Sequence, residues 1–249
     1  MKNFTQKFIG ILVLVFTMSF TVNSQEIGDI YEGGIVFYVD ETGQHGLVAA
    51  QEDLEGTYGW GCYGESVDGA DSELIGSGLQ NTTDIINQGC TTENGSTTAA
   101  QAALDAEITG YIDWYLPSKH ELTEMYNTLG NGGPEGNIGG FENSFYWSSS
   151  ENDYYNLGAF SVYFLDGYFD SYYKSNSHRV RVIRSVIFPV FGCTDSEAEN
   201  YNPNATDDDD SCIVVGCTDA TALNYYSGAN TDDGSCIVNG CMDSSMSNY

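Results

Sequence analysis

The sequence predicts an α+β domain with long loops and antiparallel strands, followed by a tail of small repeats held by disulfides. The domain prediction rests on apolar runs at both ends of residues 26–188, with two helical patterns between them. The tail prediction rests on cysteines that recur every 24 residues from Cys193 onward. Helices and strands are grouped along the domain, whereas a parallel βαβ sheet would need them to alternate.

Residues 1–24 have the pattern of a secretory signal peptide. Lys2 and Lys7 form a positive n-region before an apolar run over residues 9–16, and cleavage is expected before Gln25. The alternative is a transmembrane anchor, which needs about 20 apolar residues. We therefore expect a secreted protein, located outside the cell or at the cell surface.

The domain opens with a predicted hairpin. Residues 35–39 and 46–50 are apolar runs on either side of a polar turn. Residues 51–95 are rich in Gly, Asp, Ser and Thr, so long loops are expected there. Cys62 and Cys90 bracket these loops, and export favours a disulfide over the alternative of two free thiols.

Two helices are predicted next. The first is predicted over residues 97–109, which are rich in alanine, and Gly110 is expected to end it. The second helix begins at Ser118, where Glu121 completes a capping box, and apolar residues at helical spacing continue to Gly130.

The rest of the domain is strand-like. Residues 160–165 lead into an Asp-Gly turn, and residues 179–184 alternate arginine with apolar residues. This alternation predicts one buried and one solvated face. We expect the solvated arginines, Arg179, Arg181 and Arg184, to pair with carboxylates.

Four motifs follow one another along the domain: Gly46-Leu47-Val48-Ala49, Trp114-Tyr115-Leu116-Pro117-Ser118 with Glu121-Leu122, Tyr146-Trp147-Ser148-Ser149-Ser150-Glu151, and Val180-Arg181-Val182-Ile183-Arg184. Together, over about residues 28–186, they resemble the Lcl C-terminal domain, which is related to the Fibrobacter major paralogous domain. The resemblance implies a C-type-lectin-like fold and a surface module implicated in adhesion. Tyr115 stands where the family usually has a basic residue.

The tail contains copies of one short pattern. The expected organisation is a signal peptide 1–24, a domain 25–188, a linker 189–192 and repeats 193–216, 217–240 and 241–249, the last truncated. The first two copies predict disulfides Cys193–Cys212 and Cys217–Cys236, although a bond between Cys212 and Cys217 stays open. The pattern is similar to the GCTD…NY…DDGSC tandem repeats of large secreted bacterial proteins, which implies a modular spacer.

Acidic clusters precede the closing cysteine of each full repeat. They comprise Asp207, Asp208 and Asp209 in the first copy, and Asp232 and Asp233 in the second. Calcium takes several oxygen ligands in flexible loops and is therefore the candidate cofactor. The D-x-D-x-D-G calcium loop is absent, so a solvated acidic turn is the alternative.

Net charge limits the partners of the chain. There are 36 acidic and 7 basic residues, giving a formal net charge of −29. Binding to nucleic acid or to an anionic membrane surface requires a basic footprint, which is missing. Polyanionic glycans are disfavoured for the same reason. The remaining candidates are an extracellular glycan, a protein, or a second copy of the chain.

No motif predicts catalysis. His120-Glu121 begins like a zinc-protease helix, but Glu124 stands where the second histidine belongs. Ser171 and Lys174 match the S-x-x-K spacing without its companion motifs. We therefore predict that the protein is not an enzyme.

Aromatic and polar residues late in the domain suggest a binding surface on loops. The candidate ligand-binding residues are Trp147, Glu151, Asn152, Asp153, Tyr154, Tyr155, Tyr172 and Tyr173. Core packing is the alternative for the aromatic residues among them. We predict a non-catalytic binding or adhesion module carried on a repeat stalk. A structural component of an extracellular layer, or an enzyme of unknown type, are the alternatives.

Overall fold

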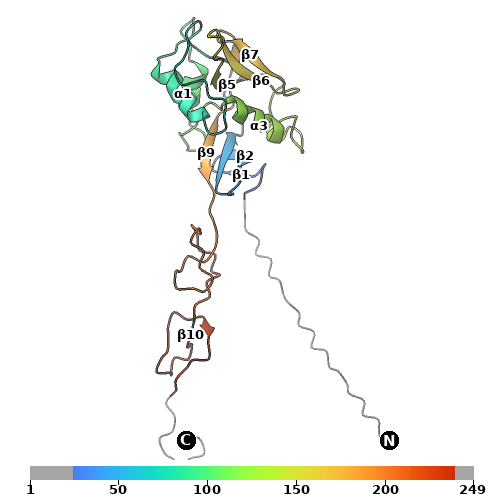
Figure 1. The fold of residues 1–249 in the computed structure, drawn as a ribbon. Helices are drawn as coiled ribbons and strands as arrows, with labels where there is room; N and C mark the ends of the chain where they lie inside the picture. The colour runs from blue at the N-terminus through green and yellow to red at the C-terminus, as the bar shows by residue number, and fades with distance from the viewer. Residues whose placement is uncertain (1–24, 239–249) are drawn as a thin grey trace, which may run out of the picture.

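The computed structural model describes residues 25–238, so the predicted signal peptide and the truncated third repeat lie outside the described residues. A domain of helices and strands is followed by an elongated tail (Figure 1). The elements are β1 (Ile30–Tyr31), β2 (Gly34–Val39), β3 (His45–Ala50), β4 (Tyr58–Gly59), α1 (Gly78–Asn87), α2 (Ala99–Leu104), α3 (Lys119–Leu129), β5 (Phe145–Glu151), β6 (Gly158–Tyr163), β7 (Phe169–Tyr173), β8 (Ser177–His178), β9 (Ile183–Ile187), β10 (Val215–Gly216) and β11 (Thr231–Asp232).

Two antiparallel sheets form the framework of the domain. The first has the order β1-β2-β3-β9, so the predicted hairpin pairs with the last strand of the domain. The second has the order β5-β6-β7, and β4 pairs separately with β8. The predicted α+β class with antiparallel strands is thus confirmed. In Figure 1 the β5-β6-β7 sheet lies at the end of the domain opposite the point where the tail leaves after β9.

The helices differ from the prediction in two places. Helix α1 lies within residues 51–95, where we expected only loops. Its buried residues are Gly78, Asn81, Thr82 and Ile85, so polar and small side chains occupy positions where an apolar stripe would identify a helix. Helix α2 is shorter than the predicted residues 97–109 because it ends at Leu104.

Helix α3 follows the sequence prediction closely. The Ser118 hydroxyl accepts a bond from the backbone N–H of Glu121 (3.3 Å), and the Glu121 carboxylate accepts one from the N–H of Ser118 (2.6 Å). This is the predicted capping box. Burial raises the pKa of Glu121, while the hydrogen bonds from Ser118 and Gly76 lower it.

All three tryptophans are fully buried in the core, and each indole N–H donates to a backbone carbonyl. Trp60 donates to Ser148 (2.8 Å) and Trp147 donates to Tyr58 (2.7 Å). Trp147 also stacks on His178, with ring centroids 4.1 Å apart. These bonds tie β5 to the segment around β4, although the two belong to different sheets.

Strand β5 also anchors the long loop before α1. The Ser150 hydroxyl donates to the carbonyl of Ser72 (2.8 Å). The N–H of Glu151 donates to the carbonyl of Ala70 (2.7 Å), and its carboxylate accepts the N–H of Val67 (2.6 Å). The Trp-Ser-Ser-Ser-Glu motif is therefore the interior support of a surface loop.

All three predicted disulfides are formed: Cys62–Cys90, Cys193–Cys212 and Cys217–Cys236. In the tail the two full copies have the same hydrogen-bond pattern, displaced by 24 residues. The N–H groups of residues 206–207 donate to the carbonyl of Val190 (2.8 and 3.1 Å). Those of residues 230–231 donate in the same way to Val214 (2.9 and 3.1 Å). Val190 falls in the predicted linker, yet it is hydrogen-bonded into the first copy.

The two copies are also joined to each other. Val214, near the end of the first copy, packs its side chain against the Cys193–Cys212 disulfide and Ala198, while its carbonyl accepts the N–H groups of residues 230–231 in the second copy. The Tyr226 hydroxyl donates to the Glu197 carboxylate across the same junction (2.8 Å). This junction has side-chain contacts as well as a peptide connection.

Candidate binding surface

Two of the predicted site residues lie in the interior. Trp147 is buried between β4 and His178, as described above. The Glu151 carboxylate contacts the Lys174 ammonium at 2.6 Å, and the two side chains are 4% and 0% exposed. Both residues support the fold, and we correct the prediction by removing them from the candidate surface.

The loop between β5 and β6 keeps most of the other predicted residues at the surface. Tyr154 is 98% exposed, and its N–H donates to the Asn152 side chain (3.0 Å). Asp153 lies near Asp71 and Glu73; burial, followed by these carboxylates, raises its pKa. Tyr172 is partly covered by Phe145 and by other rings, so it contributes mainly packing.

Three exposed tyrosines meet beside this loop. The ring of Tyr173, on β7, lies 6.1 Å from Tyr63 and 6.2 Å from Tyr155 between centroids. The three residues are 39–50% exposed. The hydroxyl of Tyr173 beside it raises the pKa of Tyr155, so Tyr155 remains a neutral phenol at physiological pH. We call Tyr63, Tyr155 and Tyr173 the tyrosine cluster.

Three open hollows adjoin the tyrosine cluster. One, of about 270 Å³, is lined by Tyr155, Ser171, Tyr172 and Tyr173. A second, of about 120 Å³, has mostly small polar residues around Tyr63: Gly59, Gly61, Thr91, Thr92, Glu93, Asn94, Ser96, Lys174, Ser175 and Ser177. A third, of about 230 Å³, shares Tyr63 and residues 91–93 with the second and is also lined by Cys62, Glu65, Gln88 and Gly89. Aromatic faces next to hydroxyl and amide groups are characteristic of surfaces that bind polar ligands.

Tyr63 and residues 91–96 are not among the site residues predicted from the sequence. The signal that identifies them is the Cys62–Cys90 disulfide, which holds both segments together beside β7. The Lys174 ammonium adds support, since it donates to the carbonyl of Glu65 (2.7 Å) in the same loop. The surface is therefore assembled from loops that a disulfide and a buried ion pair hold in place.

Every lysine and arginine within residues 25–238 contacts a carboxylate. The pairs are Lys119–Glu73 (2.8 Å), Lys174–Glu151 (2.6 Å), Arg179–Asp53 (3.4 Å), Arg181–Asp53 (2.8 Å), Arg184–Asp113 (2.7 Å) and Arg184–Glu32 (3.0 Å). The predicted pairing of the arginines is confirmed, but Arg181 and Arg184 are buried where we expected a solvated face. Acidic groups thus dominate the charge that faces solvent in this part of the chain.

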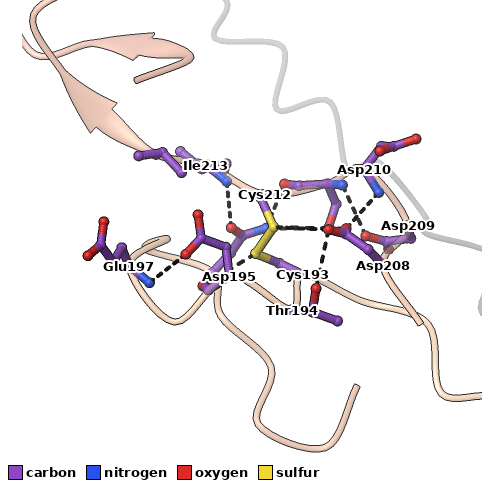
Figure 2. The surroundings of a disulfide bond; sticks show 12 residues. Cys193, Thr194, Asp195, Glu197, Asp208, Asp209, Asp210, Cys212 and Ile213 are labelled. Atoms are coloured by element: carbon purple, nitrogen blue, oxygen red, sulfur yellow. Dashed lines mark hydrogen bonds between the residues drawn. A yellow bond between two sulfur atoms is a disulfide. The ribbon is translucent and has the colours of Figure 1, made fainter. Parts of the chain in front are cut away.

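The acidic clusters of the tail are arranged as turns. Figure 2 shows Asp208 accepting hydrogen bonds from the N–H of Asp210 (2.9 Å) and the hydroxyl of Thr194 (3.3 Å) beside the Cys193–Cys212 disulfide. Asp232 and Asp233 accept equivalent backbone N–H bonds in the second copy (3.0 and 2.8 Å). Within the described residues no three acidic, histidine or cysteine side chains are grouped to hold a metal. The calcium prediction for Asp207, Asp208, Asp209, Asp232 and Asp233 therefore gains no support from the geometry.

Residues 72–184 match the family model of the Lcl C-terminal domain. The match covers α1 to the start of β9, and includes the interior Trp-Ser-Ser-Ser-Glu strand and the capped helix α3. No curated protein matches the chain. Within residues 25–238 no helix has both the length and the apolar character needed to cross a bilayer.

Proposed function

We propose that residues 25–188 form an extracellular, non-catalytic adhesion module that binds a glycan through the tyrosine cluster. The observation that carries this proposal is the meeting of three exposed tyrosines beside hollows lined by hydroxyl and amide groups. A sugar ring has an apolar face and hydroxyl edges, so it can stack on tyrosine while bonding to such groups. Tyrosine provides this contact at low conformational cost.

The match to the Lcl C-terminal domain and the three disulfides support an exported surface module. The C-type-lectin-like character of the domain is part of the same proposal. Figure 1 supports the role of the tail as a stalk, because β7, which carries Tyr173, lies at the far end of the domain from the tail. A binding surface in this position faces away from the tail.

The non-catalytic assignment is supported by the placement of the one Ser–His contact among the described residues. The Ser161 hydroxyl lies 2.7 Å from Nδ1 of His178, the geometry that activates a nucleophile. Both residues are buried, however, and His178 is covered by Trp147. Burial lowers the pKa of His178 to about 4. A substrate cannot reach this pair in the folded domain.

A glycan array, followed by titration of each hit, tests the proposal. Replacing Tyr155 or Tyr173 by alanine removes one ring face, which we estimate costs on the order of 1 kcal/mol, or about fivefold in Kd. Tyr225→Ala is the matched control, because this exposed tyrosine lies in the tail. Absence of any glycan that binds at micromolar concentration would reject the proposal. Concentration-dependent assembly in the same samples would favour the structural-layer alternative.

A further inference from the structure

We infer that the hollow between Tyr63, Glu65 and Glu93 is a subsite for an amino sugar that carries a free, protonated amine. This inference rests on the proposed glycan-binding function and specifies its ligand class. Three features of the surface support it: a cavity, an exposed aromatic ring and the local balance of charge.

The cavity lies at the boundary of two hollows. Tyr63 and Glu93 line both the 120 Å³ and the 230 Å³ hollows, and Glu65 lines the larger one. The rest of the larger wall is uncharged, formed by Cys62, Gln88, Gly89, Thr91 and Thr92. The volume of the larger hollow, about 230 Å³, exceeds the roughly 30 Å³ that one water occupies in the liquid. The larger hollow can therefore admit a substituent of a sugar ring.

The wall of the larger hollow has no lysine or arginine to pair with the two glutamates. Within residues 25–238 neither carboxylate forms an ion pair or accepts a hydrogen bond. Lys174 lines the smaller hollow and its charge interacts with Glu65, but its ammonium is buried and held by the Glu151 carboxylate at 2.6 Å. Two carboxylates therefore face solvent from a wall that contains no exposed cation.

Tyr63 supplies the second attraction for a cation. Its ring is fixed against Tyr173 edge to face, and the disulfide of the preceding Cys62 restrains its backbone. A ring face attracts an ammonium group through its quadrupole. Adjacent carboxylates and the net negative charge of the chain add to this attraction. The same groups repel sulfate and uronate, so the subsite distinguishes sugars by the sign of their charge.

Glucosamine oligomers and N-acetylglucosamine oligomers of equal length provide the test at pH 6, because they differ only in the amine. We expect the amine form to bind about tenfold more tightly at low salt, with this advantage lost at high salt. The double variant Glu65→Gln with Glu93→Gln is expected to weaken binding of the amine form about tenfold and to leave the acetylated form unchanged. Tyr63→Phe should retain binding, whereas Tyr63→Ala should reduce it.

The matched control, Glu41→Gln with Glu135→Gln, removes two exposed charges elsewhere on the domain. Equal loss in the control and the test variant would show a general charge effect and overturn the inference. Equal affinity for both oligomers would also overturn it while leaving the proposed function intact. If neither oligomer binds but other glycans do, the subsite is rejected alone. If no glycan binds, the proposed function fails with it.

Discussion

Glu151→Gln should destabilise the domain strongly, because it removes the charge opposite a buried lysine. The Lys174 ammonium donates to the Glu151 carboxylate at 2.6 Å, to the carbonyl of Glu65 at 2.7 Å and to that of Cys62 at 3.4 Å. The other carboxylate oxygen of Glu151 accepts the N–H of Val67. In the variant a single amide oxygen must serve both Lys174 and Val67, and the new NH₂ group lies among donors.

Removing one partner of a buried ion pair typically costs about 3–5 kcal/mol. Both side chains here are almost completely inaccessible, so we expect a loss within that range. For a domain of this size each kcal/mol corresponds to roughly 2–4 °C in Tm, which gives a fall of roughly 6–20 °C. The double variant Glu151→Gln with Lys174→Met should lose less than the sum of the two single variants, because no charge remains unpaired.

Urea denaturation followed by tryptophan fluorescence measures these free energies, since all three tryptophans are buried. Burial lowers the pKa of Lys174 from 10.5, with Glu151 opposing the shift. The unfolded chain then binds more protons than the folded one as pH approaches 10.5, so stability rises with pH. The rise should be steeper in Glu151→Gln, where the opposing carboxylate is gone.

Two results would refute this reasoning. One is a loss below about 1 kcal/mol in Glu151→Gln, the value of an exposed pair. The other is a double variant whose loss equals the sum of the single variants, because that shows no coupling between the side chains.

Three further predictions concern other parts of the chain. Replacing Cys62 and Cys90 by serine should lower the free energy of unfolding by roughly 3–4 kcal/mol, from the loop that the disulfide closes, as measured in urea. An unchanged midpoint would contradict it. Since burial lowers the pKa of His178 to about 4, wild-type stability should fall as pH drops from 6.5 towards 4. His178→Phe should show a smaller fall over this window, and equal slopes would argue against the assignment. Asn230→Ala removes the acceptor for the N–H of Val214 (3.0 Å), so hydrogen exchange at that amide should accelerate about tenfold, corresponding to about 1.4 kcal/mol. Retained protection would show that the junction does not depend on this bond.

The parts of the fold that the sequence predicted are those with a periodic or local signature. The capped helix α3 and the β2–β3 hairpin have such signatures, and so do the paired cysteines of the tail. Helix α1 was not predicted because polar side chains occupy part of its buried face. These side chains are stabilised there by hydrogen bonds that only the folded structure shows. The Asn81 side chain, for example, donates to the carbonyl of Ser72 (2.7 Å).

The candidate surface was predictable only in part, for a different reason. Tyr155 and Tyr173 could be named from aromatic density near the end of the domain. Whether an aromatic side chain packs into the core or lies at the surface depends on which strands pair. Strand pairing therefore explains why Tyr173 is exposed while Trp147 is buried. Tyr63 is more than a hundred residues away from Tyr173 in the chain, and only the fold brings the two together.

The disulfides of the tail determine how it responds to a pulling force. If the domain is held by its ligand and the tail by its far end, tension passes through sulfur at Cys193–Cys212 and again at Cys217–Cys236. Each bond bypasses a loop of sequence separation 19, which at about 3.4 Å per residue would otherwise extend to a span of about 65 Å. The tail is therefore nearly inextensible while both disulfides are oxidised. A reductant would open these disulfides, and the loop between each pair of cysteines could then extend under tension.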